Sequence, residues 1–300
     1  MSLTAECFEK LSAHIGYFSD STNIGVIESG DSLYIVDTGS RPRDGESIAD
    51  ALKELYPSSS VKAILNTHSH ADHCGGNSKL KEITGCGIFA PFNESRIMEF
   101  PETMCGIYWG GKPFDELRKI GYMQLTPSFT DRQLHAEEEI ETEYALIKCV
   151  SLPGHYFDHM GFLVKDKTDG KTVFFLGDSL FGMNMLKKYW IPFMVDPAEF
   201  RDSVQKIENT AADFYIPSHG EATAGYKINA LAEMNIMVTL ETETLILKTL
   251  SRARLTHEEL LEGVADFAGI DLKLGQYVLI GSTLKSYLSS LHDRGLIDFS

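Results

Sequence analysis

The sequence predicts a mixed α/β (α+β) protein, with a large domain at residues 1–225 and a small helical domain at residues 226–300. From residue 14 to residue 219, short apolar segments of strand character alternate with helical segments and turns. After Gly225 the apolar residues follow the helical period as far as Gly295. A length of 300 residues fits this division, because single cores rarely grow much beyond about 250 residues.

The composition is typical of an ordinary globular protein, with 43% hydrophobic and 23% charged residues. A formal net charge of -16 disfavours nucleic acid and anionic membrane surfaces as partners. No apolar stretch reaches the roughly 18 residues of a membrane helix, and the N-terminus lacks the pattern of a signal peptide. We therefore expect a cytoplasmic protein.

The cysteines indicate reduced thiols. Their number is odd, they are widely spaced and no CxxC occurs, which argues against a disulfide framework or a structural zinc site. They are Cys7, Cys74, Cys86, Cys105 and Cys149. For Cys74, which directly follows a histidine, a small buried side chain is preferred over a soft metal ligand or a redox sensor.

In the first part of the chain, strands are expected at 23–28 and 33–36, around the turn Ser29-Gly30-Asp31. A helix is expected at 44–56, because Ile48, Leu52 and Leu55 recur three to four residues apart. It is closed by Pro57 and three serines, and a short buried strand follows at 61–66.

Further elements continue this alternation. Helices are expected at 77–82 and 200–209, and strands at 87–90, 145–150, 161–164, 172–176 and 213–216. Segments 91–132 and 182–197 are irregular, so we interpret them as loops or short helices on the substrate side. Their aromatic residues would clamp a substrate or simply pack, and they are Tyr108, Trp109, Phe114, Tyr189 and Trp190.

The C-terminal segment predicts helices. Thr256 and Glu259 form a capping box that opens a helix through Ala268, and a second helix carries apolar residues from Tyr277 to Leu291. Residues 284–297 resemble the last helix and wing of a winged helix-turn-helix domain. Residues 251–300 contain five Lys and Arg against seven Asp and Glu, so dimerisation or covering of an active site is favoured over nucleic-acid binding.

Four potential metal ligands follow the expected strand at 61–66. They are His68, His70, Asp72 and His73. Imidazole and carboxylate groups are ligands of borderline metals such as Zn²⁺, Mn²⁺ and Fe²⁺. Their spacing on a turn would let alternate side chains bind one metal while the last two face a second.

Three later residues stand at strand ends in the same way: His155, Asp178 and His219. The other five histidines, His14, His135, His159, His257 and His292, have no such context. His159, four residues after His155, is considered as a substrate hydrogen-bonding residue. The sequence thus predicts one metal site assembled from several strand ends.

These motifs, HxHxDH, PGH, GD and a late histidine in this order, resemble the metallo-β-lactamase superfamily over residues 14–224, including its glyoxalase II-like and β-lactamase-like hydrolases. The resemblance implies an αββα sandwich of two β-sheets flanked by helices. It also implies a first metal held by His68, His70 and His155, and a second held by Asp72, His73 and His219, with Asp178 bridging both. Asp37, in Val36-Asp37-Thr38-Gly39, would orient the ligand loop without being a ligand.

We expect two divalent ions, with zinc favoured and iron or manganese as alternatives. A hydroxide bridging the two ions would attack a small-molecule ester, thioester, lactone or amide. Asp178 would bridge the ions, and Asp72 would orient the hydroxide or accept its proton. Three other hypotheses stay open: a nuclease acting on RNA or DNA phosphodiesters, an iron-dependent oxidoreductase resembling sulfur dioxygenases, and a non-enzymatic metal or ligand sensor. A homodimer through the C-terminal domain is also open.

Overall fold

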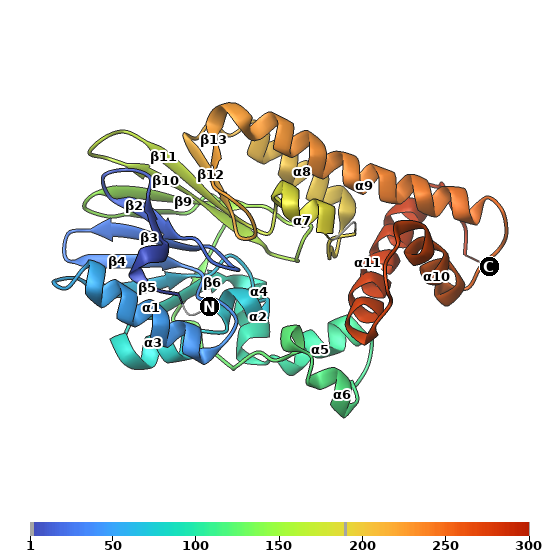
Figure 1. Ribbon diagram of the computed structural model, residues 1–300, viewed down its shortest axis with the longest axis horizontal. Coiled ribbons are helices and arrows are strands. Elements are labelled where there is room, and N and C mark those ends of the chain that lie inside the picture. The colour runs from blue at the N-terminus through green and yellow to red at the C-terminus, as the bar shows by residue number, and fades with distance from the viewer. Residues whose placement is uncertain (1–2, 189–190, 300) are drawn as a thin grey trace.

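Two β-sheets lie at the centre of the protein, and helices cover the outer face of each (Figure 1). The structure is a computed structural model and describes residues 3–188 and 191–299. One sheet has the strand order β1-β2-β3-β4-β5-β6-β7, and the other has the order β13-β12-β11-β10-β9-β8. The expected mixed α/β sandwich with helices on both outer faces is therefore confirmed.

The first sheet begins as an antiparallel meander and continues with parallel strands. Neighbours from β1 to β4 are antiparallel, and those from β4 to β7 are parallel. Two crossover helices, α1 (Pro42–Leu55) and α3 (Asn77–Thr84), pack on its outer face. The strands are β1 (Phe8–Lys10), β2 (Ile15–Phe18), β3 (Ile24–Ser29), β4 (Ser32–Val36), β5 (Ser60–Leu65), β6 (Gly87–Pro91) and β7 (Arg132–Leu134).

The second sheet is antiparallel except where β11 pairs with β12. Its inner face packs on the first sheet through residues such as Ile147, Phe162 and Phe175. Its outer face is covered by α8 (Pro197–Glu208). The strands are β8 (Glu139–Glu141), β9 (Ala145–Ser151), β10 (Met160–Asp166), β11 (Thr172–Gly177), β12 (Phe214–Pro217) and β13 (Thr223–Ala224).

The two irregular segments contain short helices, in line with one of the two forms expected for them. The first segment holds α4 (Phe92–Glu99), α5 (Glu102–Trp109), α6 (Asp115–Arg118) and a 3-10 turn at Gly121–Met123. The second holds α7 (Met183–Lys188), and the predicted aromatics Tyr189 and Trp190 lie outside the described residues. A one-turn helix, α2 (Ala71–Cys74), lies in the histidine-rich segment, and further 3-10 turns lie at Ala5–Cys7 and Gly225–Lys227.

The C-terminal part consists of α9 (Ile228–Leu250), α10 (His257–Ala268) and α11 (Leu274–Asp293). The predicted capping box of α10 is present: the backbone N–H of Thr256 donates to Glu259 over 2.7 Å, and that of Glu259 donates to Thr256 Oγ1 over 3.3 Å. The first half of α9 packs on the second sheet with α8, whereas its end packs with α10 and α11. Because α9 contributes to both clusters, the domain boundary at residue 225 stays a prediction.

A wing does not form in the part of the C-terminal segment that the structure describes. After α11, residues 294–299 form a turn and an irregular end without a strand. The helical character of the segment is confirmed, while its likeness to a winged helix stays a prediction. None of the helices in the described part of the chain has the length and apolar character that a membrane span requires.

Candidate metal centre

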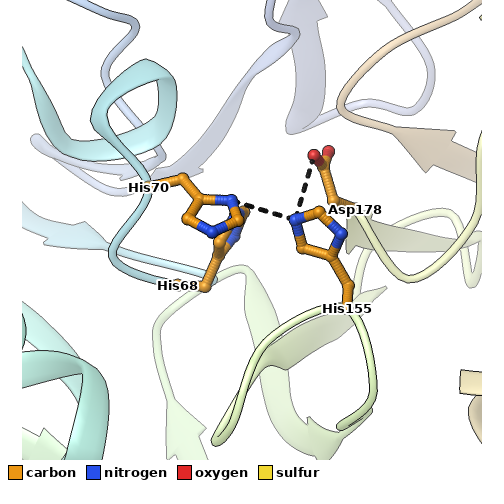
Figure 2. Close-up of side chains that lie close together, drawn as sticks. All are labelled: His68, His70, His155 and Asp178. Carbon is orange, nitrogen blue, oxygen red and sulfur yellow. Dashed lines mark hydrogen bonds and ion pairs between the residues drawn. The ribbon is translucent and has the colours of Figure 1, made fainter. Parts of the chain in front are cut away.

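The seven side chains expected to bind metal converge where strands of both sheets end. They form two groups, within each of which one ligand atom per residue lies within 4.8 Å of the others. We call His68, His70, His155 and Asp178 the first group (Figure 2). The second group contains Asp72, His73 and His219.

Asp178 faces both groups. Its Oδ2 lies 3.5 Å from Nε2 of His155 in the first group and 3.5 Å from Nε2 of His219 in the second. Its Oδ1 lies 3.5 Å from Nε2 of His73. One carboxylate is therefore shared between the two groups, which is the geometry expected of a bridging ligand.

The polar atoms of this cluster lack the partners that buried groups normally have. Nε2 of His68, His70 and His73 and Oδ1 of Asp178 are buried and make no hydrogen bond. Nδ1 of His70 also lies only 3.0 Å from Nε2 of His155, so two ring nitrogens face each other. Neutral imidazoles and carboxylates in this arrangement fit divalent cations.

The ring nitrogens that point away from the cluster are held by acceptors. Nδ1 of His155 donates to the carbonyl oxygen of Phe193 over 2.9 Å, and Nδ1 of His219 donates to that of Ser21 over 2.7 Å. A carbonyl oxygen only accepts, so each of these contacts fixes a proton on Nδ1 and turns Nε2 toward the cluster.

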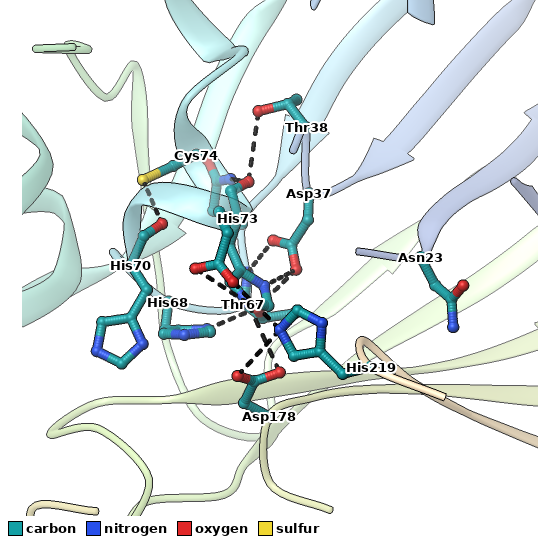
Figure 3. A network of polar contacts seen from close by, with 12 residues as sticks. Asn23, Asp37, Thr38, Thr67, His68, His70, His73, Cys74, Asp178 and His219 are labelled. Atoms are coloured by element: carbon teal, nitrogen blue, oxygen red, sulfur yellow. Dashed lines mark hydrogen bonds and ion pairs between the residues drawn. The ribbon is translucent and has the colours of Figure 1, made fainter. Parts of the chain in front are cut away.

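Asp37 organises the histidine-rich loop (Figure 3). Its Oδ2 lies 2.8 Å from Nδ1 of His73, and its carboxylate accepts hydrogen bonds from the backbone N–H and the hydroxyl of Thr67. Oγ1 of Thr67 in turn lies 3.0 Å from Nδ1 of His68. One carboxylate therefore orients a histidine of each group. Asp37 itself has a φ of 60°, an unusual backbone conformation for a residue other than glycine.

The electrostatics of the two groups differ. Burial and neighbouring histidines hold the pKa values of His68 and His70 well below the usual range, and burial lowers the pKa of His155 to about 4. Burial would also lower the pKa of His219, but Asp178 and Asp72 outweigh it and raise that pKa to about 9. His73 behaves like His219, because the same two carboxylates and Asp37 raise its pKa well above the usual value.

The carboxylates of the cluster stay ionised. Burial favours the protonated form of Asp178, but His219 and His73 hold its pKa well below the usual range. Desolvation also favours the protonated form of Asp72, but His73 and His219 outweigh it and keep the pKa of Asp72 low. Both carboxylates are therefore available as anionic ligands at neutral pH.

His159 does not have the substrate-binding role considered for it. Its side chain is completely buried, so it does not reach the pocket. Nε2 accepts a hydrogen bond from the backbone N–H of Asp178 over 3.0 Å, and Nδ1 lies 2.8 Å from Oγ of Ser179. His159 supports the loop that carries Asp178.

Glu94 is a buried carboxylate beside the site that no sequence pattern indicated. It accepts hydrogen bonds from Ser69 and from the backbone of Asp158, which flank ligands of the first group. Burial raises its pKa to about 7. Cys74 is also buried, and its Sγ donates to the carbonyl oxygen of His70 over 3.1 Å, which supports the packing interpretation.

Five residues of the cluster, His70, Asp72, His155, Asp178 and His219, line a cavity of about 1010 Å³. Tyr108, Tyr122 and Phe193 also line it, as do residues between 268 and 280 of the C-terminal part. Of the predicted aromatics, Tyr108 thus reaches the cavity. Trp109 and Phe114 instead contact each other, with ring centroids 5.7 Å apart.

Comparison with known proteins identifies the family of the chain. The sequence model of the family described as "Metallo-beta-lactamase superfamily" matches residues 19–219. The "Probable metallo-hydrolase YybB" of Bacillus subtilis is 30% identical over 202 residues, which cover 65% of this chain and 79% of that protein.

Two other relatives are matched over less of their length. The "Atrochrysone carboxyl ACP thioesterase" of Passalora fulva is 24% identical over 245 residues, which are 81% of this chain and 62% of the relative. A "Hydroxyacylglutathione hydrolase" of Hyphomonas neptunium is 29% identical over 123 residues, which are 41% of this chain and 35% of the relative. The chain thus spans less than two thirds of the length of these two proteins.

Solved structures share the fold. A metallo-beta-lactamase family protein from Thermus thermophilus superposes with a TM-score of 0.70 at 20% identity, covering 91% of this chain and 89% of that chain. A beta-lactamase domain protein from Burkholderia ambifaria has a TM-score of 0.69 at 16% identity, covering 98% and 90%. Both likenesses extend beyond the sandwich into the C-terminal helices.

Proposed function

The chain belongs to the metallo-beta-lactamase superfamily, and from this premise we propose that it is a dinuclear metal-dependent hydrolase of small-molecule esters, thioesters, lactones or amides. One observation carries the proposal. Seven side chains cluster, several of them with unpartnered ligand atoms, and five of the seven line a cavity large enough for a small organic substrate.

Each group would hold one divalent cation, with zinc as the expected metal and Asp178 between them. When bound, such cations would supply Lewis acidity toward a carbonyl oxygen and would lower the pKa of water, which is the chemistry of acyl hydrolysis. The protein's own part is to present imidazoles and ionised carboxylates in a fixed orientation, and the imidazoles of the first group are already neutral.

Asp72 is the carboxylate of the site that is most accessible from the cavity. Its side chain is 39% exposed, against 7% for Asp178, and its Oδ2 lies 3.2 Å from Nε2 of His219. Both residues line the cavity. Asp72 would therefore, besides its place in the second group, orient the attacking water and accept its proton at a carboxylate oxygen. Asp178 would act only as a ligand.

Thioesters are the first substrates to test within this class. Two of the relatives are named for the hydrolysis of acyl groups carried on sulfur, a thioesterase and a hydroxyacylglutathione hydrolase. The aromatic walls formed by Tyr108, Tyr122 and Phe193 suit an apolar acyl group beside the metal centre.

The test is a hydrolysis screen over thioesters, lactones, phosphodiesters and β-lactams, with metal content measured on the same sample purified without added metal. We expect two divalent ions per chain and hydrolysis of an acyl substrate. His70→Ala should lower that activity by more than about a hundredfold. Removing a residue that only hydrogen-bonds to a metal ligand costs about 10- to 100-fold, and removing the ligand itself should cost more. His292→Ala, a partly exposed histidine far along α11, is the matched control and should be neutral.

Two outcomes would contradict the proposal. Activity confined to phosphodiesters would overturn the substrate class and favour a nuclease. Full activity and full metal content in His70→Ala would overturn the assignment of the metal centre.

A further inference from the structure

Glu94 lies between the two loops that carry the histidines of the first group. It stands in the first turn of α4, and its side chain is completely buried. Oε2 accepts hydrogen bonds from the backbone N–H of Ser69 over 3.0 Å and from its hydroxyl over 2.6 Å. Oε1 accepts one from the backbone N–H of Asp158 over 2.9 Å. Both carboxylate oxygens are therefore used.

The two residues that donate to Glu94 lie in loops that follow strands of different sheets. Ser69 lies between His68 and His70 in the loop after β5 of the first sheet. Asp158 lies three residues after His155 in the loop between β9 and β10 of the second sheet. A single carboxylate thus connects the segments that supply all three histidines of the first group.

A reciprocal contact strengthens this connection. Oδ2 of Asp158 accepts a hydrogen bond from the backbone N–H of Asn93, the residue before Glu94, over 3.0 Å. The first turn of α4 and the Asp158 loop therefore hold each other in two places. The helix, and not only one flexible side chain, sets where this loop lies relative to Ser69.

The spacing between the Ser69 and Asp158 loops matters because the histidines of both loops must meet at the metal position. Nδ1 of His70 and Nε2 of His155 are 3.0 Å apart, and a productive site tolerates errors of only about 0.5 Å in such positions. The three groups that donate to Glu94 are uncharged. An amide in its place would lose an acceptor and turn its own N–H groups toward one of these donors.

We propose that Glu94 is a positioning residue that holds the Ser69 and Asp158 loops at the separation the first group needs, and thereby sets the affinity of that group for a divalent cation. The inference rests on the proposed metal centre, but it assigns a role to a residue that is not a ligand and does not line the cavity.

The test separates the two groups by removing one at a time from the full-length chain. His219→Ala leaves the first group complete, and His155→Ala leaves the second. Glu94→Gln is introduced into each background, and zinc affinity of the metal-free protein is measured against a competing chelator. Glu94→Gln should weaken zinc binding roughly 10- to 100-fold in the His219→Ala background and leave it within about threefold in the His155→Ala background.

Glu99→Gln is the matched control, because Glu99 ends the same helix and pairs with the exposed Arg96. It should leave zinc affinity unchanged in both backgrounds. Ser69→Ala removes only the hydroxyl donor and should weaken the first group by a smaller factor than Glu94→Gln. It keeps the proposal testable if Glu94→Gln fails to fold, which urea unfolding of the metal-free protein would reveal.

The results distinguish the inference from the proposed function. An equal loss in both backgrounds, or no loss in either, would overturn the positioning role of Glu94 while leaving the metal centre in place. If the unsubstituted chain binds no divalent cation, the proposed function itself fails.

Discussion

At the scale of single residues, the two ligand groups should respond differently to pH. The pKa of His219 is raised to about 9, and that of His73 also lies well above its usual value. Both rings are therefore doubly protonated and positively charged at pH 7 in the metal-free protein. Metal binding must displace these protons, so affinity for the second position should rise by at least about tenfold per pH unit between pH 6 and pH 8. The pKa of His155 is about 4, so the first position should change little over this range.

Zinc titrations of the metal-free His219→Ala and His155→Ala proteins at pH 6, 7 and 8 would measure each position alone. The second position still contains His73 and Asp72 in His155→Ala, so its pH dependence remains visible. A steeper pH dependence at the first position than at the second would contradict this assignment of protonation states.

The clustering of the seven candidate ligands could be predicted because each follows the end of a strand. His68, His155, Asp178 and His219 all stand within a few residues of a strand that an apolar run reveals. The supporting roles of Glu94 and His159 could not be predicted, because these side chains bind backbone groups that are distant from them in sequence. Glu94 and Asp158 are separated by 64 residues, and no local pattern records such a contact.

At the scale of elements, the loop after β9 depends on a close contact with α8. Gly154 has a φ of 116°, and a Cβ there would lie 2.1 Å from the backbone nitrogen of Phe200. Gly154→Ala should therefore destabilise the protein by more than about 3 kcal/mol or displace His155, because backbone cannot move aside as a flexible side chain can.

Gly170→Ala is the matched control for this substitution. Its φ of 77° is also positive, but a Cβ there would meet nothing within 4 Å. We expect it to cost about 1 to 2 kcal/mol, the penalty of the left-handed conformation alone. Urea unfolding of both proteins and zinc content of Gly154→Ala provide the measurement, and equal losses for the two substitutions would show that the contact with Phe200 is unimportant.

Elements with a clear period could be predicted, and very short ones could not. The helices at α1, α3, α8 and α10 and the strands β3, β5, β9 and β11 agree with their predicted ranges to within a few residues. β7, β8 and β13 contain two or three residues each, too few for an alternating pattern to show. They are stabilised by pairing with neighbouring strands, which is a property of the sheet.

At the scale of the whole molecule, the cavity is built from parts that are distant in sequence. The hydroxyl of Tyr122, in the first insertion, donates to the carbonyl oxygen of Gly275 at the start of α11 over 2.9 Å. The periodicity of the C-terminal segment predicted helices but not the surface on which they pack. A helical period shows which residues share a face, and the partner of that face comes only from the fold. Dimerisation through this segment stays a prediction.

An ion-pair network centred on the buried Glu243 connects the C-terminal helices to the sandwich. Glu243 on α9 binds Arg201 on α8 over 2.7 Å and Arg294 after α11 over 2.8 Å.

Glu243→Gln should destabilise the protein by about 3 kcal/mol, because it leaves the nearly buried Arg201 without its counter-charge. Since residues of α11 also line the cavity, KM should rise severalfold while kcat changes less. Glu241→Gln, on the exposed face of α9, should stay within about 0.5 kcal/mol of the unsubstituted protein. Urea unfolding and steady-state kinetics would decide, since a fall in kcat at constant KM would mean that α11 does not help to bind the substrate.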